Sequence, residues 1–140
     1  MGEQKLSIGL LEDNPMLSEL ITTMLEMAGH TVSTYSDGAS CLEHLFAQRG
    51  ARKEPLCDLL LVDLGLPGTL SGFDVIVYIC HTLHISTLPI IVVSGAGQEA
   101  LIQVRNSFPT IPTIQKPFQV HTLLDTIETC VSSTVRAMPC

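Results

Sequence analysis

The sequence predicts an α/β domain in which a five-stranded parallel sheet is covered by helices on both faces. Five short segments rich in apolar or β-branched residues alternate along the chain with five segments of helical periodicity. Two of the strand candidates, at 59–62 and 90–93, are apolar throughout, which is typical of parallel strands buried on both faces. A length of 140 residues fits one domain, and the chain has no linker or internal repeat.

The first strand is expected at Leu6–Leu11, and it runs directly into Glu12 and Asp13. Asn14 and Pro15 follow as a helix N-cap and a first helical residue, a position that suits proline because its missing N–H would be unpaired there anyway. The helix after them carries an apolar stripe at helical spacing: Met16, Leu17, Leu20, Ile21, Met24 and Leu25.

Gly29 is expected to close that first helix, because glycine readily adopts the left-handed conformation of a helix end. Thr31–Tyr35 is the second strand, and Ser36–Gly38 turns into a second helix. The polar segment 48–54 is expected to be a surface loop. The core positions of the second helix are Leu42, Leu45 and Phe46.

The central part of the chain predicts two buried strands around a short helix. Leu59–Val62 is the most apolar strand candidate, Phe73–His81 is the third helix, and Pro89–Val93 is the fourth strand. Pro89 is tolerated there because the first residue of a strand can lack a ladder hydrogen bond.

The last part of the chain predicts a fourth helix at Gly97–Ser107, a fifth strand at Ile111–Gln115 and a fifth helix at Phe118–Ser132. Pro112 lies inside that strand, which favours an edge position. We expect a core at about 6–132, a frayed tail at 133–140 and no output domain. The stripe of the last helix is Val120, Leu123, Leu124 and Ile127.

Composition limits the function classes. The formal net charge is −7, and the seven basic residues are scattered, so a surface for direct nucleic-acid binding is not expected. No apolar run is long enough for a membrane span, and the N-terminus has no signal-peptide pattern. A cation or a basic partner suits this charge balance better.

The five cysteines are odd in number and form no CxxC pair, which argues against a disulfide scaffold and favours a reducing, cytoplasmic location. Free cysteine is often buried, so we expect Cys57, together with Cys41 and Cys80, to be small core residues.

Charged and polar side chains follow the predicted strands where each strand ends. Glu12 and Asp13 end the first strand, Asp63 ends the third, Ser94 follows the fourth and Lys116 follows the fifth. Each residue alone has an ordinary explanation as a turn residue or a solvated charge. Ligands in open α/β sheets bind outside the carboxyl ends of the strands. The gathering of these charged and polar side chains at one edge of the sheet therefore predicts a binding site.

Three adjacent carboxylates repel one another, and a hard divalent cation such as Mg²⁺ relieves that repulsion through oxygen ligands. A carboxylate beside the metal, such as Asp63, can act as a nucleophile and form an acyl phosphate. The transferring phosphoryl group needs positive charge and hydrogen-bond donors, which Lys116 and Ser94 supply. Backbone amides near Gly65 add further donors, because glycine lets the main chain approach closely.

Four motifs, LLEDNP, LLLVDLGLPG, IIVVSGAG and QKPF, agree in order and spacing with those of a known family. The chain resembles a response-regulator receiver domain, the phosphoacceptor module of two-component signalling, from about Leu6 to Ser132. The resemblance implies a flavodoxin-like three-layer sandwich with five helices and a sheet in the order 2-1-3-4-5. It also implies a domain that catalyses its own phosphoryl transfer and autodephosphorylation.

By position, Asp63 resembles the phosphoryl acceptor of the family, and Glu12 and Asp13 resemble the acidic pair that binds Mg²⁺ or Mn²⁺. Gly65 lies where the family offers a backbone carbonyl to the metal. Lys116 matches the site lysine, and the Lys116–Pro117 bond is typically cis in the family.

Ser94 matches the switch hydroxyl of the family, whose second switch position carries Tyr or Phe. Here that position is Thr113, which has no ring to move inward when the hydroxyl turns toward the phosphoryl group. Gly72 comes one residue later than the family pattern, so the GTLSG segment is expected to bulge. Small residues at Gly65 and Ala96 are expected to influence dephosphorylation.

The resemblance implies a sensor histidine kinase or a histidine phosphotransfer protein as donor. It also implies a downstream protein partner on the face of the fourth helix, fifth strand and fifth helix, where Arg105 and Glu99 would be charged contacts. We expect a monomer or weak homodimer.

The sequence leaves three other functions to compare with this one. A pseudo-receiver would keep the fold and bind partners without phosphorylation; the intact site residues count against it and Thr113 counts mildly for it. A zinc site at His81 and His84 lacks further ligands. A phosphatase with an aspartyl nucleophile would need a second acid where Gly65 stands.

Overall fold

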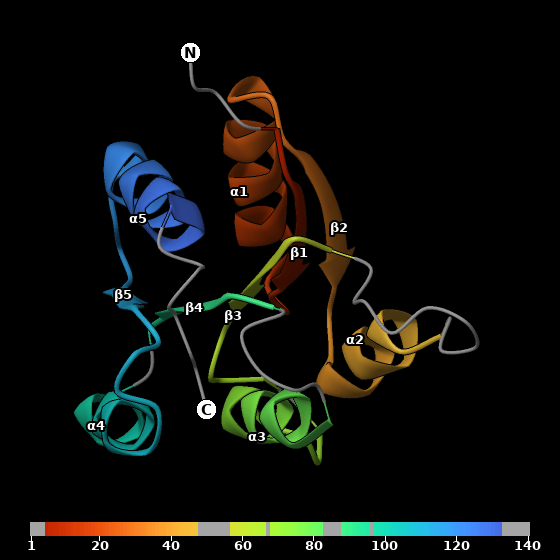
Figure 1. Ribbon diagram of the computed structural model, residues 1–140, viewed down its shortest axis with the longest axis vertical. Coiled ribbons are helices and arrows are strands. Elements are labelled where there is room, and N and C mark those ends of the chain that lie inside the picture. The colour runs from red at the N-terminus through yellow and green to blue at the C-terminus, as the bar shows by residue number, and fades with distance from the viewer. Residues whose placement is uncertain (1–4, 48–56, 67, 83–87, 96, 133–140) are drawn as a thin grey trace.

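The computed structural model describes residues 5–47, 57–66, 68–82, 88–95 and 97–132. Its centre is a parallel sheet with the strand order β2-β1-β3-β4-β5, which confirms the predicted fold (Figure 1). The order places the second and fifth strands at the edges, and an edge position for the fifth was predicted from Pro112. The strands are β1 (Ser7–Leu11), β2 (Thr31–Tyr35), β3 (Leu59–Val62), β4 (Ile90–Ser94) and β5 (Thr113–Gln115).

Five helices cover the two faces of the sheet. Figure 1 shows α1 and α5 on one side, and α2 and α3 on the other. The buried residues form two clusters: one joins the sheet to α1 and α5, and the other joins it to α2, α3 and α4. The helices are α1 (Pro15–Met27), α2 (Gly38–Leu45), α3 (Gly72–Thr82), α4 (Gln98–Ser107) and α5 (Val120–Ser132).

The apolar run of β3 serves both clusters. Leu60 and Val62 pack into the cluster under α2, α3 and α4, whereas Leu59 and Leu61 pack into the cluster under α1 and α5. Successive side chains of a strand point to opposite faces, so a strand covered on both sides must be apolar at every position. Each of these leucines is fully buried and contributes about 1.5–3 kcal/mol of hydrophobic stabilisation.

Local signals set several element ends. The Asn14 side chain accepts hydrogen bonds from the N–H groups of Met16 and Leu17, which caps α1 as predicted. Gly29 has φ of +101°, in the left-handed region that favours glycine after a helix. Asp37 caps α2 by accepting from the N–H of Ser40.

The predicted bounds differ mainly near prolines. β5 begins at Thr113 rather than Ile111, although the carbonyl of Pro112 still accepts a hydrogen bond from the N–H of Val92. α5 begins at Val120 rather than Phe118. The bond before Pro117 is cis, as the family resemblance implied.

Cys41 and Cys57 are buried in the core, as expected, and Cys80 is half-buried against it. The predicted loop at 48–54 and the predicted tail at 133–140 lie outside the described residues. Over the part of the chain that the structure describes, every helix is too short or too polar to cross a membrane.

Candidate functional site

The parallel pairing of β1 with β3 brings the predicted acidic residues together. Leu11 is in register with Val62, so Glu12 and Asp63 follow at the same edge of the sheet. The N–H of Asp63 donates to the carbonyl of Leu11 at 3.0 Å, which continues the ladder by one step. One ligand oxygen from each of Glu12, Asp13 and Asp63 lies within 4.8 Å of the others.

Two of these three carboxylates are buried. Glu12 is 4% exposed and Asp63 is 7% exposed, whereas Asp13 faces solvent. Burial raises the pKa of Glu12 above its usual value, and the charge of Asp63 adds to the rise. A hydrogen bond from Lys116 and another from the N–H of Asn14 oppose it. The fold therefore holds the Glu12 carboxyl group where its ionisation is costly unless a cation compensates.

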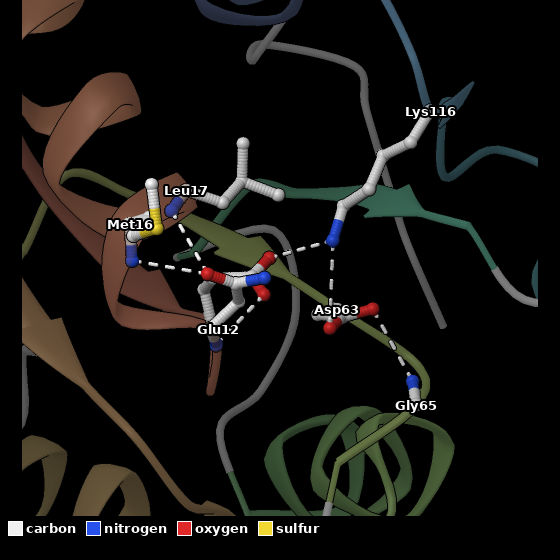
Figure 2. A network of polar contacts seen from close by, with 7 residues as sticks. Glu12, Met16, Leu17, Asp63, Gly65 and Lys116 are labelled. Carbon is white, nitrogen blue, oxygen red and sulfur yellow. Dashed lines mark hydrogen bonds and ion pairs between the residues drawn. The ribbon is translucent and has the colours of Figure 1, made fainter.

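Lys116 reaches into this acidic group from the opposite side of the site (Figure 2). Its Nζ lies 2.7 Å from Oε1 of Glu12 and 3.6 Å from Oδ2 of Asp63. Its main-chain N–H donates to the carbonyl of Ser94 at 3.0 Å, which ties the lysine to the end of β4. Among the described residues, one ammonium group contacts two of the three carboxylates, so the cluster keeps a net negative charge and suits an added cation.

The loop after β3 begins with a contact to the Asp63 side chain. The N–H of Gly65 donates to Oδ1 of Asp63 at 3.2 Å (Figure 2). A Cβ built at Gly65 would meet nothing within 4 Å, so the space beside it is open. Gly68 has φ of +89°, and this left-handed residue lies in the segment that was expected to bulge.

The two predicted switch residues lie at opposite ends of neighbouring strands. Ser94 is fully buried at the end of β4, in register with Gln115 and next to the main chain of Lys116. Thr113 is half-buried at the start of β5, two residues before Gln115, and outside the acidic cluster. Its hydroxyl accepts a hydrogen bond of 3.4 Å from Nη2 of Arg105, which links α4 to β5.

The donor set fits a hard divalent cation, because such ions prefer carboxylate and carbonyl oxygens. The alternative zinc pair has no support here: His81 is exposed on α3, and His84 lies outside the described residues. Ala96, which was expected to affect dephosphorylation, also lies outside them.

Two features of the site were not predicted. Sequence reasoning placed Lys116 near Asp63, but its closer partner is Glu12. It also treated Gly72 as a marker of loop length, although this residue lies directly against the main chain of Asp63. The available signal was a glycine at the first position of the helix that follows the loop after Asp63.

A family model described as the response regulator receiver domain matches residues 8–128 of the chain. No curated protein matches the chain. Among solved structures, a CheY-like receiver domain protein from Methanospirillum hungatei JF-1 has a TM-score of 0.77 at 20% identity, covering 95% of this chain and 98% of its own.

The phosphorylated cyanobacterial phytochrome response regulator RcpA has a TM-score of 0.70 at 24% identity, covering 98% of this chain and 100% of its own. NtrX from Brucella abortus has a TM-score of 0.77 at 22% identity, where the match covers 94% of this chain and 28% of NtrX. These likenesses agree with the fold, and the residues matched by the family model include Glu12, Asp63, Ser94 and Lys116. The chain belongs to the response regulator receiver domain family.

Proposed function

We propose that this chain is a signalling switch that accepts a phosphoryl group on Asp63 from the phosphohistidine of a sensor histidine kinase or a histidine phosphotransfer protein. The observation that carries the proposal is the placement of a buried Asp63 between an acidic pair and a lysine. A lone buried carboxylate would be costly, and this arrangement makes it useful for phosphoryl transfer.

In the proposed reaction, a carboxylate oxygen of Asp63 attacks phosphorus, and the bond between phosphorus and the donor's imidazole nitrogen breaks. The electron pair of that bond leaves with the imidazole, and an acyl phosphate remains on Asp63. Lys116, already 3.6 Å from Oδ2 of Asp63, balances the charge of the transferred oxygens. Water later attacks the acyl phosphate and returns inorganic phosphate and the free carboxylate.

Glu12, Asp13, Asp63 and the backbone carbonyl of Gly65 would hold Mg²⁺ or Mn²⁺ in this scheme. When bound, the ion supplies positive charge that neutralises the phosphoryl oxygens. The closeness of the three carboxylates supports this ligand set. The protein residues keep the acceptor oriented: Gly65 donates to one oxygen of Asp63, and Lys116 faces the other.

The signal would leave through a shift between two states of the domain. Ser94 would turn its hydroxyl toward the phosphoryl group and draw the start of α4 with it. A downstream protein would then bind the face formed by α4, β5 and α5. Thr113 lacks the family's ring, so we propose that the link from Arg105 to Thr113 carries part of this readout.

The donor protein would dock on the exposed face of α1. Met16 is 81% exposed and Leu20 is 55% exposed, and both line a groove of about 730 Å³ with Glu19. α1 begins just after Asp13, so a protein seated there could bring its phosphohistidine to the site. Helices α1 and α5 carry no Lys or Arg, so an apolar donor surface with a basic rim fits best.

We further propose a cytoplasmic location and a monomer or weak homodimer without direct nucleic-acid binding. The net charge of −7 supports the last point. Residues 1–140 would act as one receiver unit.

The direct test is to incubate the chain with Mg²⁺ and acetyl phosphate and to weigh the intact protein. We expect the mass of one phosphoryl group to be added, and we expect no addition for Asp63→Asn or after chelation of Mg²⁺. Equal labelling of Asp63→Asn would overturn the assignment of the acceptor.

The competing function is a pseudo-receiver that binds partners without phosphorylation. Thr113 is the residue that favours it, because the usual aromatic reporter is missing. Absence of labelling, together with partner binding that is equal for the wild type and Asp63→Asn, would support this alternative.

A further inference from the structure

The first turn of α3 lies against the main chain of the proposed phosphoacceptor. A Cβ built at Gly72 would lie 2.2 Å from the carbonyl oxygen of Asp63, 2.9 Å from its carbonyl carbon and 2.8 Å from Cα of Leu64. These atoms belong to the backbone, so they cannot rotate away as the end of a flexible side chain can. Only glycine fits between α3 and Asp63 in this arrangement.

A main-chain hydrogen bond also holds Gly72 close to the residue that follows Asp63. The N–H of Gly72 donates to the carbonyl of Leu64 at 3.3 Å, so the loop between them has its two ends joined. At the start of that loop, the N–H of Gly65 donates to Oδ1 of Asp63. Asp63 is thus held at its carboxylate by Gly65 and at its main chain by Gly72.

The start of α3 is itself fixed, so it cannot retreat easily from Asp63. The N–H of Ser71 donates to Oδ2 of Asp74, and the N–H of Asp74 donates to Oγ of Ser71, each at 3.1 Å. This is a reciprocal capping arrangement, which satisfies free N–H groups of the first turn. Val75 and Ile76, which follow, are fully buried in the core under α3.

We propose that Gly72 is a positioning residue for phosphoryl transfer, which sets the place of Asp63 by contact between main chains. This inference rests on the proposed function of Asp63. Because the base of the loop is fixed at Gly72, the extra residue of this loop can be absorbed further out, where Gly68 is left-handed and a Cβ would meet nothing within 4 Å. Asp63 therefore keeps its relation to Glu12 and Lys116.

A glycine needed only for folding would behave differently, and Gly38 provides the matched control. A Cβ at Gly38 would lie 2.8 Å from Cγ2 of Val75 and 3.1 Å from Cβ of Leu70, so this position is also crowded in the layer of α2 and α3. None of the three nearest atoms belongs to Asp63 or Leu64. Gly38→Ala should therefore cost stability without displacing the acceptor.

The experiment compares the wild type, Gly72→Ala and Gly38→Ala at a temperature where circular dichroism finds all three folded. Mg²⁺ affinity is measured by calorimetry, and the initial rate of labelling by acetyl phosphate is measured by intact mass. A misplacement near 1 Å can cost about a hundredfold in rate, so we expect Gly72→Ala to lose at least tenfold. Gly38→Ala should stay within about twofold of the wild type.

Equal losses for the two variants, or a wild-type rate for Gly72→Ala, would overturn the positioning role. If Gly72→Ala does not fold, the wild type supplies the test through amide signals during a Mg²⁺ titration. The Gly72 amide should shift with the same midpoint as Gly65, while Gly29 and Gly38 stay still; an unmoved Gly72 signal contradicts the inference. A wild type that neither binds Mg²⁺ nor becomes labelled overturns the proposed function instead, and the positioning role with it.

Discussion

Nζ of Lys116 lies 2.7 Å from Oε1 of Glu12, closer than the 3.6 Å that separates it from Oδ2 of Asp63. Glu12 is 4% exposed, so the ammonium group compensates a buried carboxylate that is also a proposed metal ligand. A cation that binds Glu12 must therefore compete with Lys116. Once displaced, the lysine would be free to face the phosphoryl group that we propose for Asp63.

Replacing Lys116 should accordingly move metal binding and phosphoryl transfer in opposite directions. Lys116→Met removes a competing positive charge, and we expect Mg²⁺ to bind about threefold to tenfold more tightly by calorimetry, a gain near 1 kcal/mol. The same variant loses charge stabilisation of the transferred oxygens, so labelling by acetyl phosphate should slow about a hundredfold. Lys5→Met, at an exposed position, is the control; weaker Mg²⁺ binding by Lys116→Met would contradict the competition.

The sequence predicted the central strands of the sheet more completely than the contacts within the site. The runs at 59–62 and 90–93 could be placed in the centre of the sheet, because only strands covered on both faces remain apolar at every position. The first residue of β5 could not be predicted, because Pro112 pairs with β4 only through its carbonyl and has no N–H to donate.

For the site, the strand ends identified the residues that meet, but not their burial or their pairing with one another. Sequence could not tell which of Glu12 and Asp13 is buried, because that depends on how the strand leaves the sheet. It also could not show that Lys116 prefers Glu12, since the pair is 104 residues apart and its distance depends on side-chain reach.

Alkaline pH should destabilise the fold through its buried thiols. Burial raises the pKa of Cys41 to about 12 and that of Cys57 to about 11, from an ordinary value of 9.0. The folded protein therefore holds these protons more tightly than the unfolded chain. The resulting stability is fully present below about pH 9 and is lost as pH rises through the folded pKa values.

Between pH 9 and 11, the free energy of unfolding should fall by about 1.4 kcal/mol per pH unit for each thiol. Urea unfolding at a series of pH values measures this slope. Cys41→Ala should show a shallower slope than the wild type, whatever its stability at neutral pH. Equal slopes for the two proteins would mean that Cys41 does not titrate as its burial implies.

Gly65 should control how long the phosphoryl group survives. A Cβ built there meets no neighbour within 4 Å, so we expect Gly65→Leu to be accommodated beside Asp63 and to shield the acyl phosphate from water. We expect its lifetime, followed as loss of the added mass after the donor is removed, to lengthen about threefold or more. Glu43→Leu, at an exposed position of α2, is the control for added apolar surface, and an unchanged lifetime for Gly65→Leu would reject this role.

The exposed face of α1 should matter for a protein donor and not for a small one. Leu20→Glu places a charge in the groove beside Met16, which disfavours an apolar partner surface. We expect transfer from a kinase or phosphotransfer protein that labels the wild type to slow about tenfold or more, a loss near 1.4 kcal/mol in the encounter. Labelling by acetyl phosphate should stay within about twofold, because Leu20 is 55% exposed and makes no part of the acidic site.

Met27→Glu is the matched control for Leu20→Glu. Met27 is 83% exposed on the same helix, but it is the last residue of α1 and lies at the end away from Asp13. It should leave both donors unaffected. If the two variants slow the protein donor equally, the effect comes from added negative charge on α1 in general. If Leu20→Glu also slows acetyl phosphate, the substitution has disturbed the site, and the groove is not a docking surface for the donor.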